Sequence, residues 1–389
     1  MPFDALPVYH VITPGDHFSP RTGSAIPTVV DGLARAARAA GDSARYPQRV
    51  VVQEDTYQPR YDSADPVAYP GVSAPGMRRR LADVALGRLG LPRSGVRAYF
   101  RPAADVIRDR APGIVLAHNA PALVPLVRDQ AHRVVLYAHN DILRSYSRRE
   151  AARALGGVAA VICVSDDLAA QVREQVPLSM RARVCTVVNG VDTEQFTPAR
   201  QRAAGPVRVM FVGRMSADKG ADILLAAAAQ AKLSDTEYII VGSHGFDSTA
   251  PLSPYERRLR ALAESVAGDV RFQPFVGRDR MPQLLREADI LVVPSRWREP
   301  LTLTVGEGLA TGLPVVAARR GGIPQALGDA GMLFEPDRPA ELAEVLTRLA
   351  DDVGLRAELG AAARSRALAH DWGWAWGALR DVLDEVGGL

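Results

Sequence analysis

The chain has 389 residues, of which 47% are hydrophobic and 23% charged, a balance that is typical of folded proteins and excludes wholesale disorder. At about 100–200 residues per domain, this length predicts two domains that are each large enough to bury a core. The formal net charge of +3 is too small to indicate a nucleic-acid partner, and no apolar run approaches the roughly 20 residues that a membrane span needs.

Short β-rich runs alternate with longer Ala-, Leu- and Arg-rich helical patterns along the chain, which predicts βαβ units and parallel sheets. In the first half the expected strands are Val8–Thr13, Val50–Gln53, Ile114–Ala117, Val134–Ala138 and Ala160–Val164. The helices expected between them are Ile26–Ala40, Met77–Leu89, Ala120–Gln130 and Asp166–Val176.

The second half of the chain repeats this alternation. Its expected strands are Val207–Val212, Glu237–Val241, Val270–Phe272, Ile290–Pro294 and Val315–Ala317. Its expected helices are Ala221–Lys232, Tyr255–Ser265, Met281–Ala288 and Ala340–Leu349. A polar, proline-containing stretch, Asn189–Pro206, separates the two series and marks the expected domain boundary.

We therefore predict an α/β protein with two Rossmann-like, doubly wound parallel-sheet domains facing a central cleft, where ligands of this fold class bind. Residues 1–195 form the predicted N-terminal domain and residues 196–369 the predicted C-terminal domain. Residues 370–389 include Trp372, Trp374 and Trp376. This composition predicts an apolar helix that packs across the domain junction.

Three first-domain residues are candidate ligand contacts because they follow predicted strands. Gly23 lies in the first βα turn, where a flexible backbone can touch a phosphate. His118 and His139 end their strands at the edge that would present them to the cleft, and we assign His118 to acceptor binding. A histidine at a strand end also serves as a structural hydrogen-bonding group, and that alternative remains open for both.

The loop after the strand Val207–Val212 places Arg214 and Lys219 between Gly213 and Gly220. Gly213 lets the backbone approach a ligand, and the helix that follows offers free N–H groups at its N-terminus. The planar fork of Arg214 and the point charge of Lys219 suit a diphosphate, although two solvated cations in an ordinary loop are the alternative. The loop does not have the Walker A spacing.

Two carboxylates, Glu299 and Glu307, flank the start of another predicted helix. A helical rise of about 1.5 Å per residue would separate them by about 10–12 Å, too far for a hydrolytic pair of glycosidase carboxylates. This spacing suits two grips on an extended ligand, and acids that merely complement a helix N-terminus are the alternative.

Neither of the two cysteines, Cys163 and Cys185, belongs to a metal-binding spacing, since the sequence has no CxxC or HExxH motif. Both lie in apolar runs, which predicts buried thiols rather than a disulfide. We expect no metal site.

In this order the motifs resemble the retaining glycosyltransferases of family 4, which have the GT-B fold. The resemblance covers nearly the whole chain and is most specific in its second half. The residues that carry it are Gly213, Arg214, Lys219, Gly220, Glu299 and Glu307, with His139 and the segments 189–192, 308–316 and 321–324.

The resemblance implies that residues 1–195 bind the acceptor and residues 196–369 bind the nucleotide sugar, and it implies a role for each candidate residue. Arg214 and Lys219 would neutralise the departing diphosphate, so that the nucleotide sugar is a co-substrate and no metal or other cofactor is required. Glu299 and His139 would contact the donor sugar and complete the catalytic set. The implied donor-binding residues are Gly23, Gly213, Arg214, Lys219, Val276, Thr302, Leu303, Thr304 and Glu307.

The implied reaction is transfer of a hexose or modified hexose from a nucleoside diphosphate, UDP favoured over GDP, to a hydroxyl of a small-molecule or lipid-linked acceptor. The acceptor would attack from the front side, with retention of configuration. Thr302, Pro274 and Gln325 depart from the family pattern and leave the donor's identity open. A GT-B-like sugar-nucleotide epimerase and a non-catalytic nucleotide-sugar-binding partner protein are the alternatives.

The segment Arg78–Arg110 contains nine arginines and only three acidic residues. It predicts either an electropositive face for an anionic acceptor or membrane surface, or a solvated surface in an arginine-rich chain. Because the N-terminus shows no secretion signal, we expect a cytoplasmic protein with possible peripheral membrane contact. The oligomeric state has no signature in the sequence.

Overall fold

The computed structural model describes residues 5–127, 131–200, 205–245, 249 and 251–388. The chain divides into two compact units, of which the first comprises Met1–Pro20, Ser24–Asn189 and Trp372–Leu389. The second comprises Arg21–Gly23 and Gly190–Asp371. The division after Asn189 lies at the start of the stretch 189–206, slightly before residue 195, and it groups the C-terminal helix with the first unit.

The first unit contains a parallel sheet of seven strands in its described residues, in the order β3-β2-β1-β4-β5-β6-β7. The strands are β1 (Val8–Val11), β2 (Gln48–Gln53), β3 (Asp65–Tyr69), β4 (Ile114–His118), β5 (Arg133–Ala138), β6 (Ala160–Cys163) and β7 (Val184–Thr186). The helices are α1 (Ala25–Ala39), α2 (Met77–Arg88), α3 (Ser94–Arg108), α4 (Val124–Val127), α5 (Arg148–Ala154), α6 (Asp166–Gln175) and α14 (Trp372–Gly387), with short 3₁₀ helices at Asp42–Ala44 and Leu178–Arg183.

The second unit contains a parallel sheet of six strands in its described residues, in the order β10-β9-β8-β11-β12-β13. The strands are β8 (Val207–Val212), β9 (Thr236–Val241), β10 (Asp269–Gln273), β11 (Ile290–Val293), β12 (Val315–Ala318) and β13 (Met332–Phe334). The helices are α7 (Ala221–Ala231), α8 (Pro254–Ala263), α9 (Met281–Leu285), α10 (Leu303–Ala310), α11 (Ile323–Leu327), α12 (Pro339–Asp351) and α13 (Val353–Ala369), with a 3₁₀ turn at Ala217–Lys219.

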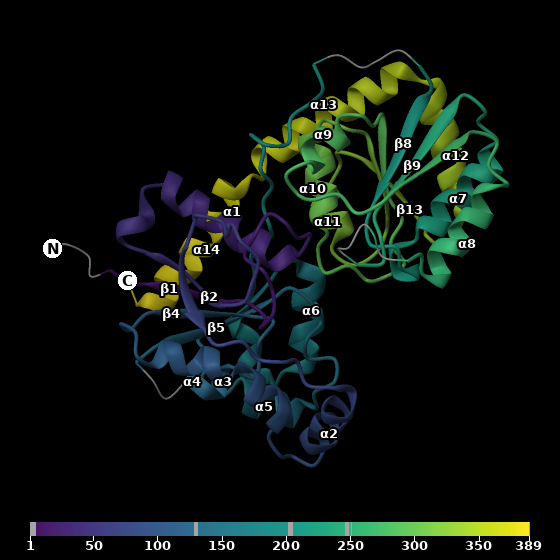
Figure 1. Ribbon diagram of the computed structural model, residues 1–389. Coiled ribbons are helices and arrows are strands. Elements are labelled where there is room, and N and C mark those ends of the chain that lie inside the picture. Colours follow the sequence, from purple (N-terminus) through teal and green to yellow (C-terminus); the bar gives the residue numbers. More distant parts are fainter. Residues whose placement is uncertain (1–4, 128–130, 201–204, 246–248, 250, 389) are drawn as a thin grey trace. The chain divides into compact units, whose positions relative to one another are not determined.

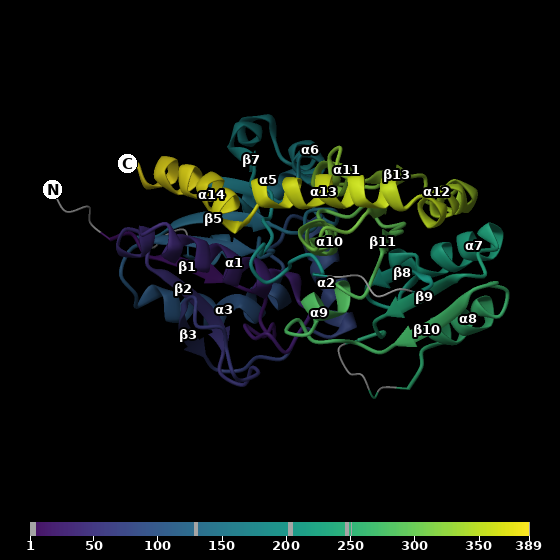
Figure 2. The same ribbon diagram turned by 90° about the horizontal axis from the view of Figure 1, so that it is seen from above.

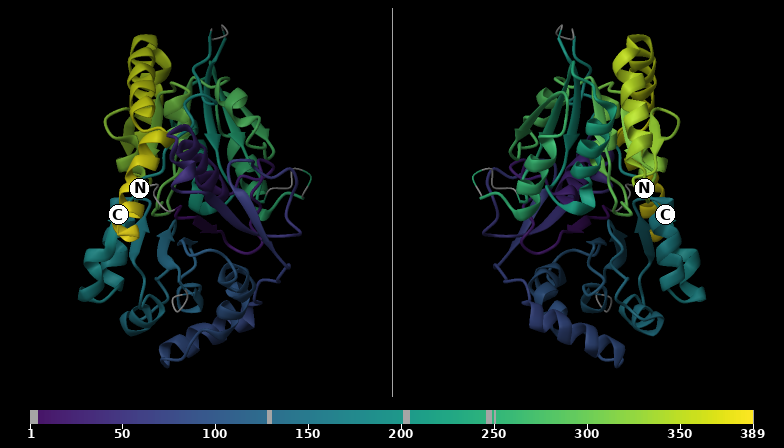
Figure 3. Two further views of the ribbon diagram at one scale, coloured as in Figure 1. Left: turned by 90° about the vertical axis from the view of Figure 1, so that its left-hand side faces the viewer. Right: turned by 90° about the vertical axis from the view of Figure 1, so that its right-hand side faces the viewer.

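Both sheets therefore have the doubly wound order in which the chain starts in the middle, builds one side and then returns to build the other. Helices cover both faces of the sheet in each unit (Figure 1), and the side views show the strands of the second unit lying between its helices (Figure 3). This confirms the predicted class of two parallel-sheet α/β domains.

Two details differ from the sequence prediction for helices. The helix expected at 120–130 is ordered here only as α4, Val124–Val127, and residues 128–130 lie outside the described part. The helix expected at Met281–Ala288 ends at Leu285, because the chain must turn to enter β11 at Ile290. Both cysteines are free thiols, as predicted; Cys163 is buried, whereas Cys185 is only partly buried.

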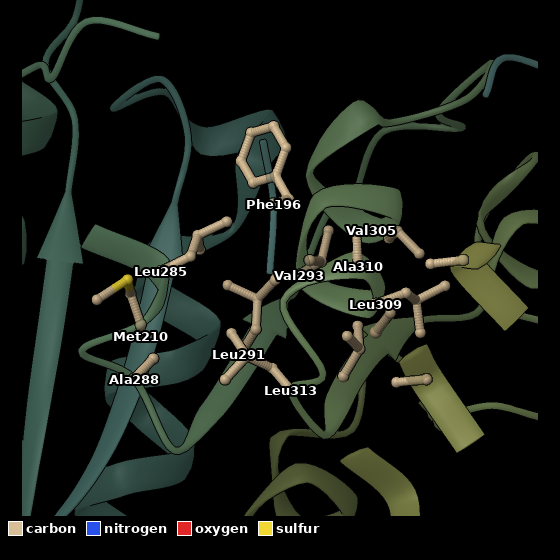
Figure 4. Close-up of a cluster of buried hydrophobic side chains, with 14 of the residues drawn as sticks. Phe196, Met210, Leu285, Ala288, Leu291, Val293, Val305, Leu309, Ala310 and Leu313 are labelled. Atoms are coloured by element: carbon tan, nitrogen blue, oxygen red, sulfur yellow. The ribbon is translucent and has the colours of Figure 1, made fainter. Parts of the chain in front are cut away.

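The buried side of helix α10 packs against strand β11, next to candidate site residues of the second unit. Val305 and Leu309 belong to the same hydrophobic cluster as Leu291 and Val293 of β11, and Figure 4 shows these side chains close to one another. Gly308 allows this close packing, since a Cβ there would lie 2.3 Å from the Leu291 side chain. The helix start and the end of β11 are thus held together.

The C-terminal helix α14 packs against α1 within the first unit (Figure 2). Gly32 of α1 leaves room for the Trp372 indole, because a Cβ at position 32 would lie 2.2 Å from that ring. Trp376 is buried and donates its Nε1–H to Asp42 at 2.7 Å, and Asp384 accepts from Arg45 at 2.6 Å. The helix is therefore an integral part of this unit's core.

Trp376→Ala is expected to lower the free energy of unfolding of the first unit by about 3–5 kcal/mol, because it leaves a cavity and an unpaired Asp42. Trp376 is 1% exposed, whereas Trp374 on the same helix is 40% exposed, so Trp374→Ala is the matched control with a smaller loss. Calorimetric unfolding of both variants measures the difference. Equal losses would show that α14 is not anchored through Trp376.

Candidate active site

The residues that sequence motifs single out in the second unit follow the carboxyl ends of its strands. Gly213 and Arg214 follow β8, and Val276 follows β10. Glu299 lies in the loop after β11, and Glu307 lies on α10. Since all strands are parallel, these ends share one edge of the sheet, which is the edge where doubly wound folds bind ligands.

The turns after β8 and β9 are locked against each other by glycines. Gly242 has a φ of +136°, and a Cβ there would lie 1.9 Å from the Gly213 carbonyl oxygen. Gly213 donates its N–H to Val241 O at 3.1 Å, and Met215 donates to Ser243 O at 3.0 Å. The backbone at Gly213 is therefore held in one position directly before Arg214.

Gly220 determines where Lys219 lies. It adopts a φ of +76°, and a Cβ at this position would lie 2.0 Å from the Pro294 carbonyl oxygen at the end of β11. Only glycine permits this approach without strain. The close contact brings Lys219, on the β8 side, next to the loop that carries Glu299.

Lys219 and Glu299 form an ion pair, with Nζ 2.6 Å from Oε1. The same oxygen accepts from the Ser295 hydroxyl at 2.8 Å. The backbone of Glu299 is fixed as well, because its carbonyl accepts from Gly322 N at 2.7 Å, and a Cβ on Gly321 would lie 2.1 Å from that carbonyl oxygen. Two residues predicted from separate motifs, a partly buried lysine and a buried glutamate, are thus paired within one hydrogen-bonded group.

Arg214 contrasts with Lys219 because its side chain is 58% exposed. Its nearest carboxylate is Asp218, 3.9 Å from Nη2, at the limit of an ion pair. An exposed guanidinium with such a weak internal partner keeps its donors available for an anion. The loop therefore presents one paired and one available cation.

Glu307 is held by a residue that the sequence motifs do not indicate, Arg278. Its Nη2 lies 2.7 Å from Glu307 Oε1, and both side chains are largely buried. Arg278 follows β10 just beyond Val276, which packs in part against the hydrophobic core. The carboxylate at the start of α10 is therefore charge-balanced within the unit.

The start of α10 is accessible to a ligand. Thr302 is its N-cap residue and, in the described structure, makes no side-chain hydrogen bond to the first-turn amides. Thr302, Leu303 and Thr304 are half-buried. These free amides carry the positive end of the helix dipole, which suits an anionic group.

In the first unit, the two predicted histidines are joined by a third that the motifs miss. His139 Nε2 lies 2.7 Å from His118 Nδ1, and His118 Nε2 lies 3.0 Å from His10 Nδ1. His118 is fully buried and both of its nitrogens are occupied in this row. His118 is therefore an internal link of this row, and its predicted acceptor contact stays a prediction, whereas His139 is 8% exposed.

Gly23 is exposed and lies two residues before α1. Nearby, Ser24 donates its hydroxyl to Asp16 at 2.9 Å, and burial raises the pKa of that carboxyl. The structure adds no side-chain contact that would assign a ligand to this loop.

Burial keeps all three histidines neutral. It lowers the pKa of His10 to about 4 and, together with repulsion from His10, that of His139 to about 3. Burial and the two neighbouring histidines also hold the pKa of His118 well below its usual range. None of the three is therefore positively charged near neutral pH.

These shifts predict how stability depends on pH. An unfolded chain protonates its histidines near pH 6.5, whereas the folded row resists protonation down to about pH 4. Stability is thus fully present above pH 6.5 and falls below it, by about 1.4 kcal/mol per pH unit for each histidine. Urea unfolding at pH 7.5, 6.5, 5.5 and 5.0 measures this slope, and His139→Asn should reduce it by about one proton. An identical slope in the variant would contradict the assignment.

Among the described residues, no group of three or more His, Cys, Asp or Glu side chains is arranged to hold a metal ion. Likewise, none of the described helices combines the length and apolar character required to cross a bilayer.

Comparison with known proteins places these features in a family. Residues 26–195 match the family described as Glycosyltransferase Family 4, and residues 206–352 match Glycosyl transferases group 1. Spore coat protein SA of Bacillus subtilis is 30% identical over 279 residues, which cover 66% of this chain and 73% of that protein. D-inositol 3-phosphate glycosyltransferase of Streptomyces bingchenggensis is 33% identical over 284 residues, or 68% of this chain and 62% of that protein.

Solved structures agree on the fold at low sequence identity. Anabaena HepE, solved in complex with UDP and glucose, aligns with a TM-score of 0.72 and 18% identity over 97% of this chain and 99% of that one. Sucrose-phosphate synthase from Thermosynechococcus elongatus aligns with a TM-score of 0.74 and 19% identity over 98% of this chain and 99% of that one. Together with the match to the spore coat protein, these findings show that the chain belongs to the family 4 glycosyltransferases and has the GT-B fold.

Proposed function

We propose that this glycosyltransferase moves a hexose or modified hexose from a nucleoside diphosphate sugar, with UDP favoured over GDP, to a hydroxyl of a small-molecule or lipid-linked acceptor. The observation that carries the proposal is the pair of cations after β8. Arg214 has an exposed guanidinium, and Lys219 is held rigidly by Glu299. Preorganised cations of this kind stabilise negative charge that develops on a leaving diphosphate.

The proposed mechanism follows from these positions. Arg214, Lys219 and the free amides at the start of α10 bind the two phosphates, and Glu307 binds the nucleoside ribose. Glu299 and His139 orient the sugar. The glycosidic bond breaks as the phosphate takes up the electron pair, and the acceptor hydroxyl attacks the same face with retention, giving its proton to a phosphate oxygen. The charge is carried by side chains, so the proposed chemistry requires no metal.

The acceptor side of the proposal has separate support. Relatives from several actinobacteria, 32–36% identical to this chain, are named D-inositol 3-phosphate glycosyltransferases, a name that describes a small, phosphate-bearing acceptor with hydroxyl groups. This supports a small-molecule acceptor. The chain spans 50–63% of the length of these three relatives. Their named activity therefore serves here to choose the acceptors that are tested.

A panel of nucleotide sugars tests the proposed function. Thermal-shift measurements identify the donor, because a ligand that binds only the folded state raises the apparent stability. Incubation of that donor with inositol phosphates and lipid acceptors, followed by product analysis, should show transfer with an unchanged anomeric configuration. Conversion of the donor sugar without any acceptor would instead indicate an epimerase, and binding without conversion would indicate a non-catalytic protein.

We further propose a peripheral membrane contact through α2. Its outward surface carries the exposed apolar side chains Met77 and Leu81 together with the exposed arginines 78, 79 and 80. The opposite side of α2, which packs on the rest of the first unit, makes polar contacts instead. There Asp83 accepts hydrogen bonds from Gly95 N and Val96 N at 2.9 and 2.8 Å. Apolar side chains interleaved with cations suit an anionic bilayer. Co-sedimentation with phosphatidylglycerol vesicles should decrease for Leu81→Glu and stay unchanged for Leu178→Glu, an exposed position on the 3₁₀ helix Leu178–Arg183.

A further inference from the structure

A polar row crosses one face of the first unit's sheet. It consists of Gln48 on β2, His10 on β1, His118 at the end of β4 and His139 just after β5, and these four strands are consecutive neighbours in the sheet. All four side chains are buried. Buried polar groups need hydrogen-bond partners, and here they partner one another.

The strand register produces this row. His10 lies opposite Leu116, and His118 is two residues further along β4, so that the two histidines lie on the same face. On the next strand, Tyr137 of β5 lies opposite His118. His139 is two residues beyond Tyr137 along the chain, on the same face of the sheet. Each step therefore moves toward the carboxyl ends of the strands, and the row ends with His139 at that edge of the first unit's own sheet.

The direction of every hydrogen bond in the row follows from one carbonyl. Tyr46 O can only accept, so the neighbouring Gln48 Nε2, at 2.7 Å, must donate to it. This orients Gln48 Oε1 toward His10 Nε2 at 2.8 Å, and an amide oxygen can only accept. His10 therefore carries its proton on Nε2 and accepts at Nδ1 from His118 Nε2–H. By the same logic, His118 Nδ1 accepts from His139 Nε2–H.

The Nδ1 atom of His139, the last ring of the row, carries no proton. His139 is neutral because burial lowers its pKa, so its single ring proton is the one given to His118. In the described part of the chain, no residue donates to His139 Nδ1. The backbone is fixed too, since His139 N donates to Asn119 Oδ1 at 2.7 Å.

We infer that Gln48, through His10 and His118, fixes His139 as a hydrogen-bond acceptor, so that the site takes a donor sugar presenting a hydroxyl to Nδ1 and rejects one presenting a carboxylate there. This inference rests on the proposed function for its sugar ligand. A hydroxyl can donate to the bare nitrogen, whereas a carboxylate offers only lone pairs. The substrate class is therefore a neutral hexose rather than a uronate at that position, and Gln48 is a positioning residue.

The tautomers are measured directly by NMR of ¹⁵N-histidine-labelled protein, independently of any activity. Wild-type protein should show His10, His118 and His139 all protonated on Nε2 and bare on Nδ1, with signals assigned from single His→Gln variants. An Nδ1–H tautomer in any of the three would overturn the inference even if the proposed function holds.

Variants at position 48 test whether Gln48 sets this direction. Gln48→Met removes the accepting oxygen and should allow Nδ1–H tautomers to appear, whereas Gln48→Glu keeps an oxygen facing His10 and should retain the wild-type pattern. Gln53→Met is the matched control, because Gln53 is buried on the same strand and outside the row. Unchanged tautomers in a folded Gln48→Met protein would overturn the role of Gln48.

Deoxyfluoro donors test the hydroxyl, because fluorine can accept but cannot donate. With UDP-glucose and its 2-, 3-, 4- and 6-deoxyfluoro analogues, one position should lower kcat/KM about 10–100-fold in the wild type and no more than about 3-fold in His139→Ala. The comparison cancels any effect of fluorine on the chemistry itself. If the fluorine penalty at every position is the same in both proteins, the inference is wrong. UDP-glucuronate should be a poorer donor than UDP-glucose, and equal use would also contradict it.

Discussion

Arg214→Ala is expected to lower kcat about 100-fold or more while the thermal stability stays close to that of the wild type. The loss follows from removing a preorganised donor that stabilises charge on the leaving group, which typically costs about 10²–10³ in rate. Stability is spared because the side chain is 58% exposed and its ion-pair partner Asp218 lies 3.9 Å away, at the limit of an ion pair. Steady-state kinetics with the donor found in the nucleotide-sugar panel, together with a melting curve, measure both effects.

Arg338→Ala provides the control for this experiment. Arg338 is another exposed arginine of the second unit, and it pairs with Glu341 at 2.9 Å on the helix surface. Its removal should leave kcat within about 2-fold. Turnover by Arg214→Ala close to the wild-type rate would refute the proposed diphosphate contact.

Lys219→Ala is expected to abolish most turnover and also to destabilise the second unit. The side chain of Glu299 is only 6% exposed, and the substitution leaves its carboxylate without the partner that lies 2.6 Å away. Breaking a buried ion pair from one side costs about 3 kcal/mol, the low end of the range, because Lys219 itself is 22% exposed. Loss of activity in this variant alone therefore has two possible causes.

The double variant Lys219→Met with Glu299→Gln separates these causes. A neutral glutamine can still accept from the Ser295 hydroxyl, which bonds Glu299 at 2.8 Å, so most of the lost stability should return. Turnover should stay low, and below that of Glu299→Gln alone, because Glu299→Gln keeps the Lys219 cation and the double variant does not. If activity recovers together with stability, Lys219 acts only in folding, and the proposed contact with the diphosphate is wrong.

The strands in the middle of both sheets could be predicted because most of them are apolar runs, as in Val134–Ala138 and Ile290–Val293. The strands that escaped prediction lie at the edges. Asp65–Tyr69 contains Pro66, which an edge strand tolerates but an apolar-run criterion does not detect. Val184–Thr186 and Met332–Phe334 are three residues long, too short for a periodic pattern.

The site divides in the same way between local and tertiary information. Arg214, Lys219, Glu299 and Glu307 could be nominated because glycines, prolines and predicted helix starts surround them in the sequence. Their partners could not. Arg278 is one arginine in a chain that contains many, and only the fold places it 2.7 Å from Glu307.

The histidine row shows the same limit. His10 is a single polar residue in the apolar strand Val8–Val11, and this is the signal that the sequence offers. Its meaning depends on the strand order β2-β1-β4-β5, which brings it between Gln48 and His118. A position at a strand end does not reveal that both ring nitrogens of His118 are already bonded within the protein, and its predicted acceptor contact stays a prediction.

The most direct test of the account is the affinity of the protein for a nucleoside diphosphate compared with its nucleoside, measured by calorimetric titration. Wild-type protein should bind UDP, or GDP if the panel selects it, at least about 100-fold more tightly than uridine or guanosine, and this ratio should collapse in the Arg214→Ala Lys219→Met double variant. An equal affinity of the wild-type protein for the diphosphate and the nucleoside, or a ratio that survives the loss of both cations, would contradict the claim that Arg214 and Lys219 bind the diphosphate.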